Sequence, residues 1–301
     1  MRFRLAIIIT FLFFSLKTDA QVLSLYPNPL ETKQHPFNEL FISRNNIKSI
    51  VVEISTKKEM DIIRSAHQFR VYEFDDTGHL LSEKKFKMVT SDSVDLSHDT
   101  LYLSYNYNSA GKLTDRVEYM GKGFVKKYFG YDQKNQLNQV ITTQYDYKNP
   151  ENGRIISKDS IITIENEDMI VQRYFNDYNR PYKEIRLMYD SLGYLYRYRE
   201  MFLISKRIHT IDYKYNDMGL LLEVLFKYSD TDPPRKEVYQ YDGFGFPEAQ
   251  FIYIDNKLTE RKEFLFREDG SLKAILTKDM GSNLITIWEM GYVEWVNAIM
   301  R

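Results

Sequence analysis

The segment at positions 213–221 reads YKYNDMGLL, and variants of it recur along most of the chain. The pattern is an aromatic residue, any residue, a second aromatic, Asp or Asn, two further residues, Gly and, two positions later, Leu. The second aromatic stands at Phe74, Tyr107, Tyr131, Tyr189, Tyr215, Tyr241 and Phe266, with a degraded copy at Phe175. The last four complete copies are 26, 26 and 25 residues apart, which indicates an internal repeat.

Each copy predicts a β-hairpin. Asp or Asn opens the turn by accepting hydrogen bonds from the backbone two residues on. Gly, or Asn in its place, supplies the positive φ that closes a three-residue hairpin loop with a bulge. The predicted structural turn residues are Asp75, Gly78, Asn108, Gly111, Asp132, Asn135, Asp190, Gly193, Asn216, Gly219, Asp242, Gly245 and Gly270.

The segments between these turns alternate in polarity, as half-buried strands do. Runs bounded by turns give about 18 strands between Ile47 and Ile287, without a convincing helix. We therefore expect an all-β fold, a long antiparallel β-meander over residues 46–301. Because open sheets beyond about ten strands usually curl or split, a strongly twisted, curling repeat sheet is predicted. The Pro-containing segment 21–45 is expected to be extended and to cover one edge or end of the sheet.

Residues 1–20 are typical of a secretory signal peptide. Arg2 and Arg4 precede an apolar run from Leu5 to Leu16, and cleavage is expected near Ala20. A membrane anchor is the alternative, but a span needs about 20 apolar residues. The expected location is periplasmic or secreted, with no membrane span after cleavage.

Composition narrows the classes of function. Cleavage would leave 38 basic residues against 41 acidic ones, a balance that does not favour nucleic acid as a partner. The chain has no cysteine, which excludes disulfides and cysteine-based zinc sites. Tyr is abundant at 24 residues, in keeping with strands.

The copies resemble the YD repeat of Rhs and teneurin-like proteins over residues 68–275. In those large proteins the repeats wind a β-sheet into a shell, often around a C-terminal toxin, and the resemblance implies a related sheet here. This chain is short and lacks the Asp-Pro-x-Gly-Leu boundary that precedes the toxin. It is more similar to small exported proteins that carry only such repeats, so the resemblance implies a fold rather than encapsulation.

No catalytic or metal-binding pattern stands out. The five histidines lack metal-ligand spacing, and His79, beside a turn Gly, is expected to face solvent. The Asp and Asn residues of the turns do not follow the acidic spacing of a calcium loop. We therefore expect a protein without enzymatic activity and without a cofactor.

The motif tyrosines are the candidate ligand-facing residues: Tyr105, Tyr107, Tyr213, Tyr215, Tyr239 and Tyr241. Exposed, they would form an aromatic platform for sugars or a partner protein; buried, they would be the core of the sheet. The leading hypothesis is a non-catalytic interaction or envelope-associated scaffold. The alternatives are a carbohydrate-binding protein and a periplasmic immunity-type partner of a toxin. The partner expected is an unknown protein or a cell-envelope glycan.

Overall fold

The computed structural model describes residues 21–25, 27, 35–90, 93–95, 101–228 and 232–295. The predicted signal peptide therefore lies outside the described residues. One helix and nineteen strands are present in this part of the chain: α2 (Glu39–Arg44), β1 (Ile47–Lys58), β2 (Arg64–Phe74), β3 (Leu80–Thr90), β4 (Ser93–Asp95), β5 (Leu101–Tyr107), β6 (Leu113–Met120), β7 (Gly123–Tyr131), β8 (Leu137–Asp146), β9 (Asn149–Glu165), β10 (Met169–Phe175), β11 (Pro181–Tyr189), β12 (Leu195–Phe202), β13 (Ile208–Tyr215), β14 (Leu221–Lys227), β15 (Arg235–Tyr241), β16 (Pro247–Ile254), β17 (Lys257–Phe266), β18 (Leu272–Asp279) and β19 (Leu284–Glu294).

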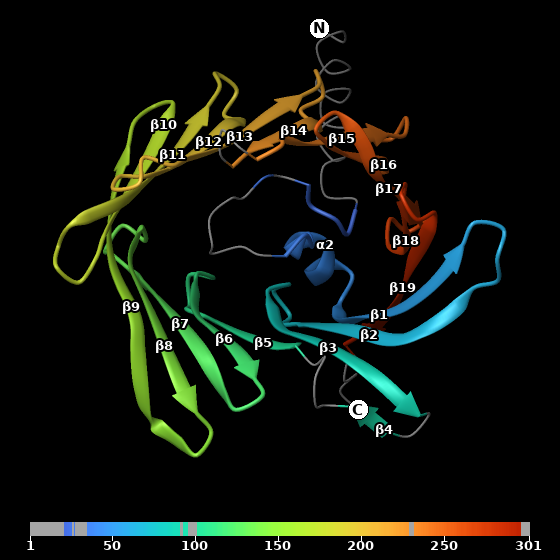
Figure 1. Ribbon diagram of the computed structural model, residues 1–301, viewed down its shortest axis with the longest axis horizontal. Helices are drawn as coiled ribbons and strands as arrows, with labels where there is room; N and C mark the ends of the chain where they lie inside the picture. Colours follow the sequence, from blue (N-terminus) through green and yellow to red (C-terminus); the bar gives the residue numbers. More distant parts are fainter. Residues whose placement is uncertain are drawn as a thin grey trace, which may run out of the picture.

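The strands form a closed antiparallel β-barrel of 18 strands, so the prediction of a β-meander that forms a strongly twisted, curling sheet is wrong (Figure 1). The nineteenth strand, β4, pairs only with β3 and lies outside the ring. Closure comes from β1, which pairs with β2 on one side and with β19 on the other.

The pairing of β1 with β19 runs from Ile47 opposite Glu294 to Lys58 opposite Leu284. Apolar side chains oppose each other across it, for example Val52 and Met290, both buried. An open sheet would expose these side chains and two rows of backbone hydrogen-bonding groups. The closed ring buries the side chains and pairs the backbone groups with each other.

The motif turns have one shared geometry. Their glycines have φ between +70° and +92°, and Asn135 takes a φ of 58° where the motif has Asn in place of Gly. In the copy at positions 213–221, Asn216 Oδ1 accepts hydrogen bonds from the backbone N–H groups of Met218, at 3.0 Å, and Leu220, at 2.9 Å. The register shift between Lys214 and Tyr215, just before the turn, is the bulge that increases the twist of the two strands.

The inward face of the barrel forms its hydrophobic core. Phe74, Leu80 and Phe129 are fully buried there. Figure 1 shows α2 inside the ring of strands. Phe41 and Ile42 of α2 belong to the same core, as do Val22 and Leu23 from the described part of the N-terminal segment. These residues therefore plug part of the lumen. The N-terminal segment was expected to cover an edge or end of the sheet, but the closed ring has no free edge to cover.

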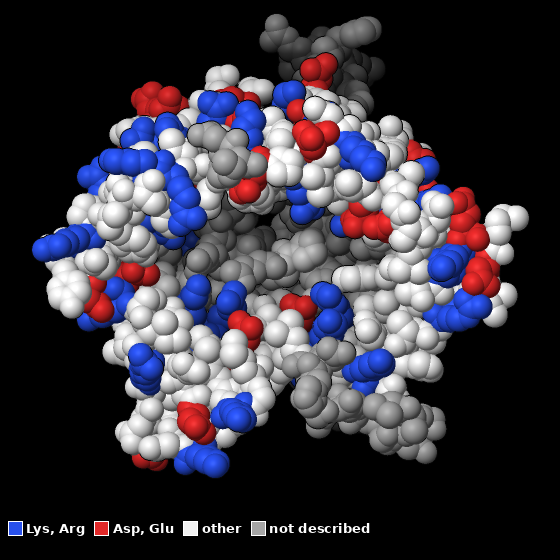
Figure 2. Space-filling model, viewed as in Figure 1, with Lys and Arg blue, Asp and Glu red and all other residues white. Residues whose placement is uncertain are grey.

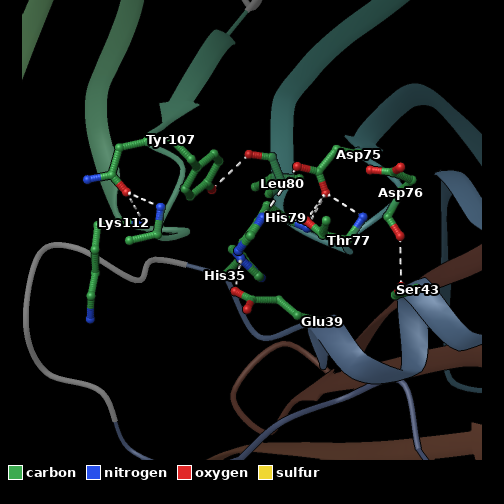
Figure 3. A network of polar contacts seen from close by, with 12 residues as sticks. His35, Glu39, Ser43, Asp75, Asp76, Thr77, His79, Leu80, Tyr107 and Lys112 are labelled. Atoms are coloured by element: carbon green, nitrogen blue, oxygen red, sulfur yellow. Dashed lines mark hydrogen bonds and ion pairs between the residues drawn. The ribbon is translucent and has the colours of Figure 1, made fainter.

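Helix α2 begins where Asn38 caps it, inside the range expected to be extended. The Asn38 side-chain oxygen accepts hydrogen bonds from the N–H groups of Leu40 and Phe41. The helix docks on the first motif turn, where the Ser43 hydroxyl donates to the Asp76 carbonyl at 2.7 Å (Figure 3). At Gly78 a Cβ atom would overlap the Glu39 carbonyl, coming 2.8 Å from its carbon, so the docking needs glycine there.

Candidate functional site

The motif tyrosines point into the barrel rather than onto its outer face. Tyr105, Tyr213 and Tyr239 are buried, with 6–8% of each exposed. Tyr107, Tyr215 and Tyr241 are half-buried and pack against the core. The structure therefore places all six candidate ligand-facing residues in or beside the hydrophobic core.

The second tyrosine of a motif also links one hairpin to the preceding one. Its hydroxyl donates a hydrogen bond to the carbonyl of the Leu that closes the earlier copy. For the motif tyrosines these donor and acceptor pairs are Tyr107 and Leu80, Tyr131 and Leu113, Tyr215 and Leu195, and Tyr241 and Leu221, at 2.7–2.9 Å. Tyr292 on β19, which is outside the motif copies, donates to the Leu272 carbonyl in the same way at 2.8 Å. The motif tyrosines thus have a structural role that connects repeats around the ring.

His79 packs against the next hairpin and does not face solvent as expected. Its ring stacks on Tyr107 with centroids 4.7 Å apart, and its Nδ1 lies 2.6 Å from the Thr77 hydroxyl (Figure 3). Only 21% of its side chain is exposed. Turn position alone could not reveal this, because the stacking partner belongs to the next hairpin.

A luminal cavity of about 410 Å³ is a candidate site among the described residues. One wall consists of Leu25 and Pro27 from the N-terminal segment. The other wall is the inward face of four consecutive strands, β12 to β15. The lining residues on those strands and the residue that follows β14 are Tyr198, Glu200, His209, Ile211, Tyr213, Leu221, Val224, Phe226, Tyr228, Glu237 and Tyr239.

Glu200 and His209 form the first polar group of this cavity. They are directly opposed across β12 and β13, with His209 Nδ1 3.1 Å from Glu200 Oε2. Lys183 Nζ lies 3.5 Å from the other carboxylate oxygen of Glu200. The contact at Nδ1 orients the imidazole ring. The ring of Tyr228 meets it edge-on, with centroids 5.7 Å apart.

Glu237 is the centre of the second polar group. The Tyr239 hydroxyl and the Gln250 amide each donate to it at 2.8 Å, and Arg235 pairs with it at 2.6 Å. Burial, followed by the charge of Glu237, raises the pKa of Tyr239 well above its ordinary value. The phenol therefore remains a neutral hydrogen-bond donor at physiological pH.

Sequence reasoning did not single out Glu200, His209 or Glu237. All three lie on strands between motif turns, and only the pairing of strands brings them together. The structure contains no group of three or more His, Cys, Asp or Glu residues able to hold a metal ion, within the residues it describes.

Comparisons with known proteins leave the family open. No protein-family model matches the sequence, and no curated protein matches it. Similar solved structures include a porin-like protein from Bacteroides uniformis, at 10% identity over 83% of this chain and 97% of that chain, with a TM-score of 0.40.

A porin-like protein from Bacteroides vulgatus is 11% identical over 82% of this chain and 98% of that one, with a TM-score of 0.31. The Tc holotoxin pore of Photorhabdus luminescens is 14% identical over 72% of this chain and 11% of that chain, with a TM-score of 0.32. Because all three TM-scores are below 0.5, these similarities assign no function to the chain. The resemblance to YD repeats stays a prediction.

Proposed function

We propose that the protein is an exported, non-catalytic binding scaffold of the cell envelope whose barrel stands in water. The observation that carries the proposal is the outer wall, which is covered with ion pairs. Side chains that follow one another along a strand point to opposite faces. Asp212 and Lys214 flank the inward Tyr213, and both therefore face outward.

Ion pairs recur on this wall around the barrel. Arg197 contacts Asp212 at 2.5 Å, and Lys214 contacts Glu223 at 2.9 Å. The other outward pairs are Glu73 with Lys84, Asp115 with Lys126, Glu184 with Arg173 and Arg186, and Arg261 with Glu263. Figure 2 looks into the ring of strands and shows charges of both signs interspersed around its rim.

These charges support a barrel that does not face lipid. A membrane barrel presents an apolar outer band about 25 Å tall, and one Arg or Lys at its midplane costs about 2–4 kcal/mol. Here several strands carry charges at most of their outward positions. The structure contains no helix long and apolar enough to cross a membrane, over the residues that it describes.

The Glu184 carboxylate shows how the wall holds charge. Only 3% of its side chain is exposed, yet Arg173 and Arg186 each contact it at 2.6 Å. Burial favours the neutral acid, but the hydrogen bonds from the two guanidinium groups outweigh it and lower the pKa of Glu184. The pair of arginines, half-exposed, places positive charge on the surface, where it can meet a partner.

The partly filled lumen favours the function of a binding scaffold over that of a channel. Core side chains and α2 fill the part of the barrel nearest the first motif turn. The luminal carboxylates Glu200 and Glu237 are each engaged with a cation and a second polar group. The two carboxylates are therefore held in fixed positions, which suits a protein that binds a partner.

The first test is the partition of the mature chain, starting at Gln21, between water and lipid. Detergent-free purification followed by flotation with liposomes should leave the protein monodisperse in the aqueous fraction. Stable insertion into the vesicles would overturn the proposal.

The second test is binding to envelope material. The mature chain should co-sediment with an envelope fraction, and the double variant Arg173→Glu, Arg186→Glu should weaken this binding because it reverses the charge on the wall. Lys278→Glu, on β18, is a matched surface control. Turnover of a glycan, peptide or ester substrate that is abolished by one Asp or Glu substitution would refute the non-catalytic assignment.

A further inference from the structure

We propose that the luminal cavity between the N-terminal segment and β12–β15 is a binding site for a neutral carbohydrate of one or two rings. The proposal concerns the lumen alone and does not depend on what the outer wall binds. It rests on the size of the cavity, on the neutral balance of its charges and on the mixture of aromatic and polar groups that line it.

The size of the cavity suits a small ligand. Its volume of about 410 Å³ falls within the range of about 300–1,000 Å³ found for small-molecule sites. Leu25 and Pro27 form one wall of the cavity, and the hydrogen-bonded strands β12–β15 form the opposite wall. A site of this kind can hold a ligand without remodelling the sheet.

The charges that line the cavity are already balanced by the protein. Lys183 and His209 contact the two oxygens of Glu200, and Arg235 pairs with Glu237. A cationic ligand would compete with these partners, and an anionic one would face two carboxylates. A neutral ligand avoids both costs, because burying an unpaired charge is unfavourable.

The polar groups of the cavity offer hydrogen bonds to hydroxyls. The carboxylates of Glu200 and Glu237 can accept further hydrogen bonds from ligand O–H groups, because each oxygen has two lone pairs. Tyr228, which is 43% exposed, presents a hydroxyl that can both donate and accept. Among the described residues, no hydrogen bond engages His209 Nε2, which leaves it to a ligand.

The apolar lining complements the other side of a sugar ring. Phe226 and Tyr228 have their ring centroids 6.0 Å apart at an interplanar angle of 24°, a nearly parallel pair. Tyr213 and Ile211 line the cavity beside them. Aromatic and aliphatic surfaces bury the C–H faces of a sugar while its hydroxyls reach the polar groups. A purely apolar ligand would offer no hydrogen-bond partner to the Tyr228 hydroxyl or to His209 Nε2.

Isothermal titration calorimetry on the mature chain tests this proposal. The probes are glucose, N-acetylglucosamine, maltose and cellobiose, with glucosamine as a cationic and glucuronate as an anionic comparison. At least one neutral sugar should bind more tightly than both charged ones. The variants His209→Gln and Tyr228→Phe should each weaken that binding about tenfold, the loss expected for a hydrogen bond with a polar ligand.

Glu223→Gln is the matched control, because Glu223 lies on β14 and faces outward. This variant should bind the sugar as the unsubstituted chain does. Circular dichroism and thermal unfolding establish that every variant is folded before titration. The proposal is overturned if none of the neutral probes binds, if a charged sugar binds best, or if both cavity variants bind with unchanged affinity.

Discussion

Substitution of Gly78 by Ala tests how the N-terminal plug is held in the barrel. Gly78 has a φ of +92°, and its missing side chain leaves room for the backbone of Glu39. Gly193 has a φ of +83° and no atom within 4 Å of the Cβ position. The variants Gly78→Ala and Gly193→Ala therefore share the backbone strain and differ in the contact with α2.

The magnitudes follow from these two contributions. A non-glycine residue in the left-handed region costs about 1–2 kcal/mol, which is the loss expected for Gly193→Ala. At Gly78 the Cβ would also overlap backbone atoms, at 2.8 Å from the Glu39 carbonyl carbon and 3.0 Å from its Cα. Overpacking of this kind costs about 1–3 kcal/mol, and displacement of the helix would break the hydrogen bond between Ser43 and Asp76. We expect a total of about 3–5 kcal/mol.

Urea unfolding of both variants measures the difference in free energy. Amide hydrogen exchange over residues 39–45 distinguishes local undocking of α2 from global loss of stability, because undocking accelerates exchange there and leaves β12–β15 protected. Equal losses of stability in the two variants, with unchanged exchange in α2, would refute the docking role assigned to Gly78.

Three further predictions concern the barrel wall and its core. Tyr241→Phe removes the hydroxyl that donates to the Leu221 carbonyl and should destabilise the protein by about 1–2 kcal/mol in urea unfolding. The double variant Thr56→Cys, Thr286→Cys should form an intramolecular disulfide on mild oxidation, visible as a gel mobility shift. These two residues are direct partners across the closing strand pair, where Cα atoms lie about 4.5–5.5 Å apart. Burial raises the pKa of Tyr105 from 10.0 to about 12, so its stabilising contribution is present below pH 10 and is lost as the pH rises towards 12. Ultraviolet titration of tyrosinate should accordingly show a late class of tyrosines that ionises as the barrel unfolds.

Each of these predictions has a control. Tyr196 is 41% exposed, and Tyr196→Phe should leave stability nearly unchanged. Either single cysteine variant should remain monomeric without a mobility shift under reducing conditions and form no internal bond under oxidising ones. A double variant that stays reduced would contradict the closed ring. Complete ionisation of tyrosines near pH 10 in the folded state would contradict the burial of Tyr105.

The sequence is most informative where the structure is local. Turns such as Asn216 to Gly219 depend on residues a few positions apart, and the antiparallel strands follow from those turns. Closure of the barrel depends on β1 and β19, which come from opposite ends of the described chain and carry no motif. The same is true of the cavity, because His209 meets Glu200 only through the register of two strands. Asn38 is a local signal for the start of α2, because Asn is a favoured N-cap residue. The expectation of an extended segment, which was based on the prolines that precede Asn38, missed this signal.

Closure by the first and last strands of the ring has a consequence for biogenesis. Most strand pairs join neighbours along the chain and can form as each hairpin leaves the ribosome or the translocon. The pairing of β1 with β19 must wait until β19 is synthesised, and it bears the loop-closure entropy of all the residues between the two strands. Until then the nascent sheet has two unpaired edges that can capture another copy. Premature termination before β19 should therefore yield an aggregating species rather than a smaller barrel.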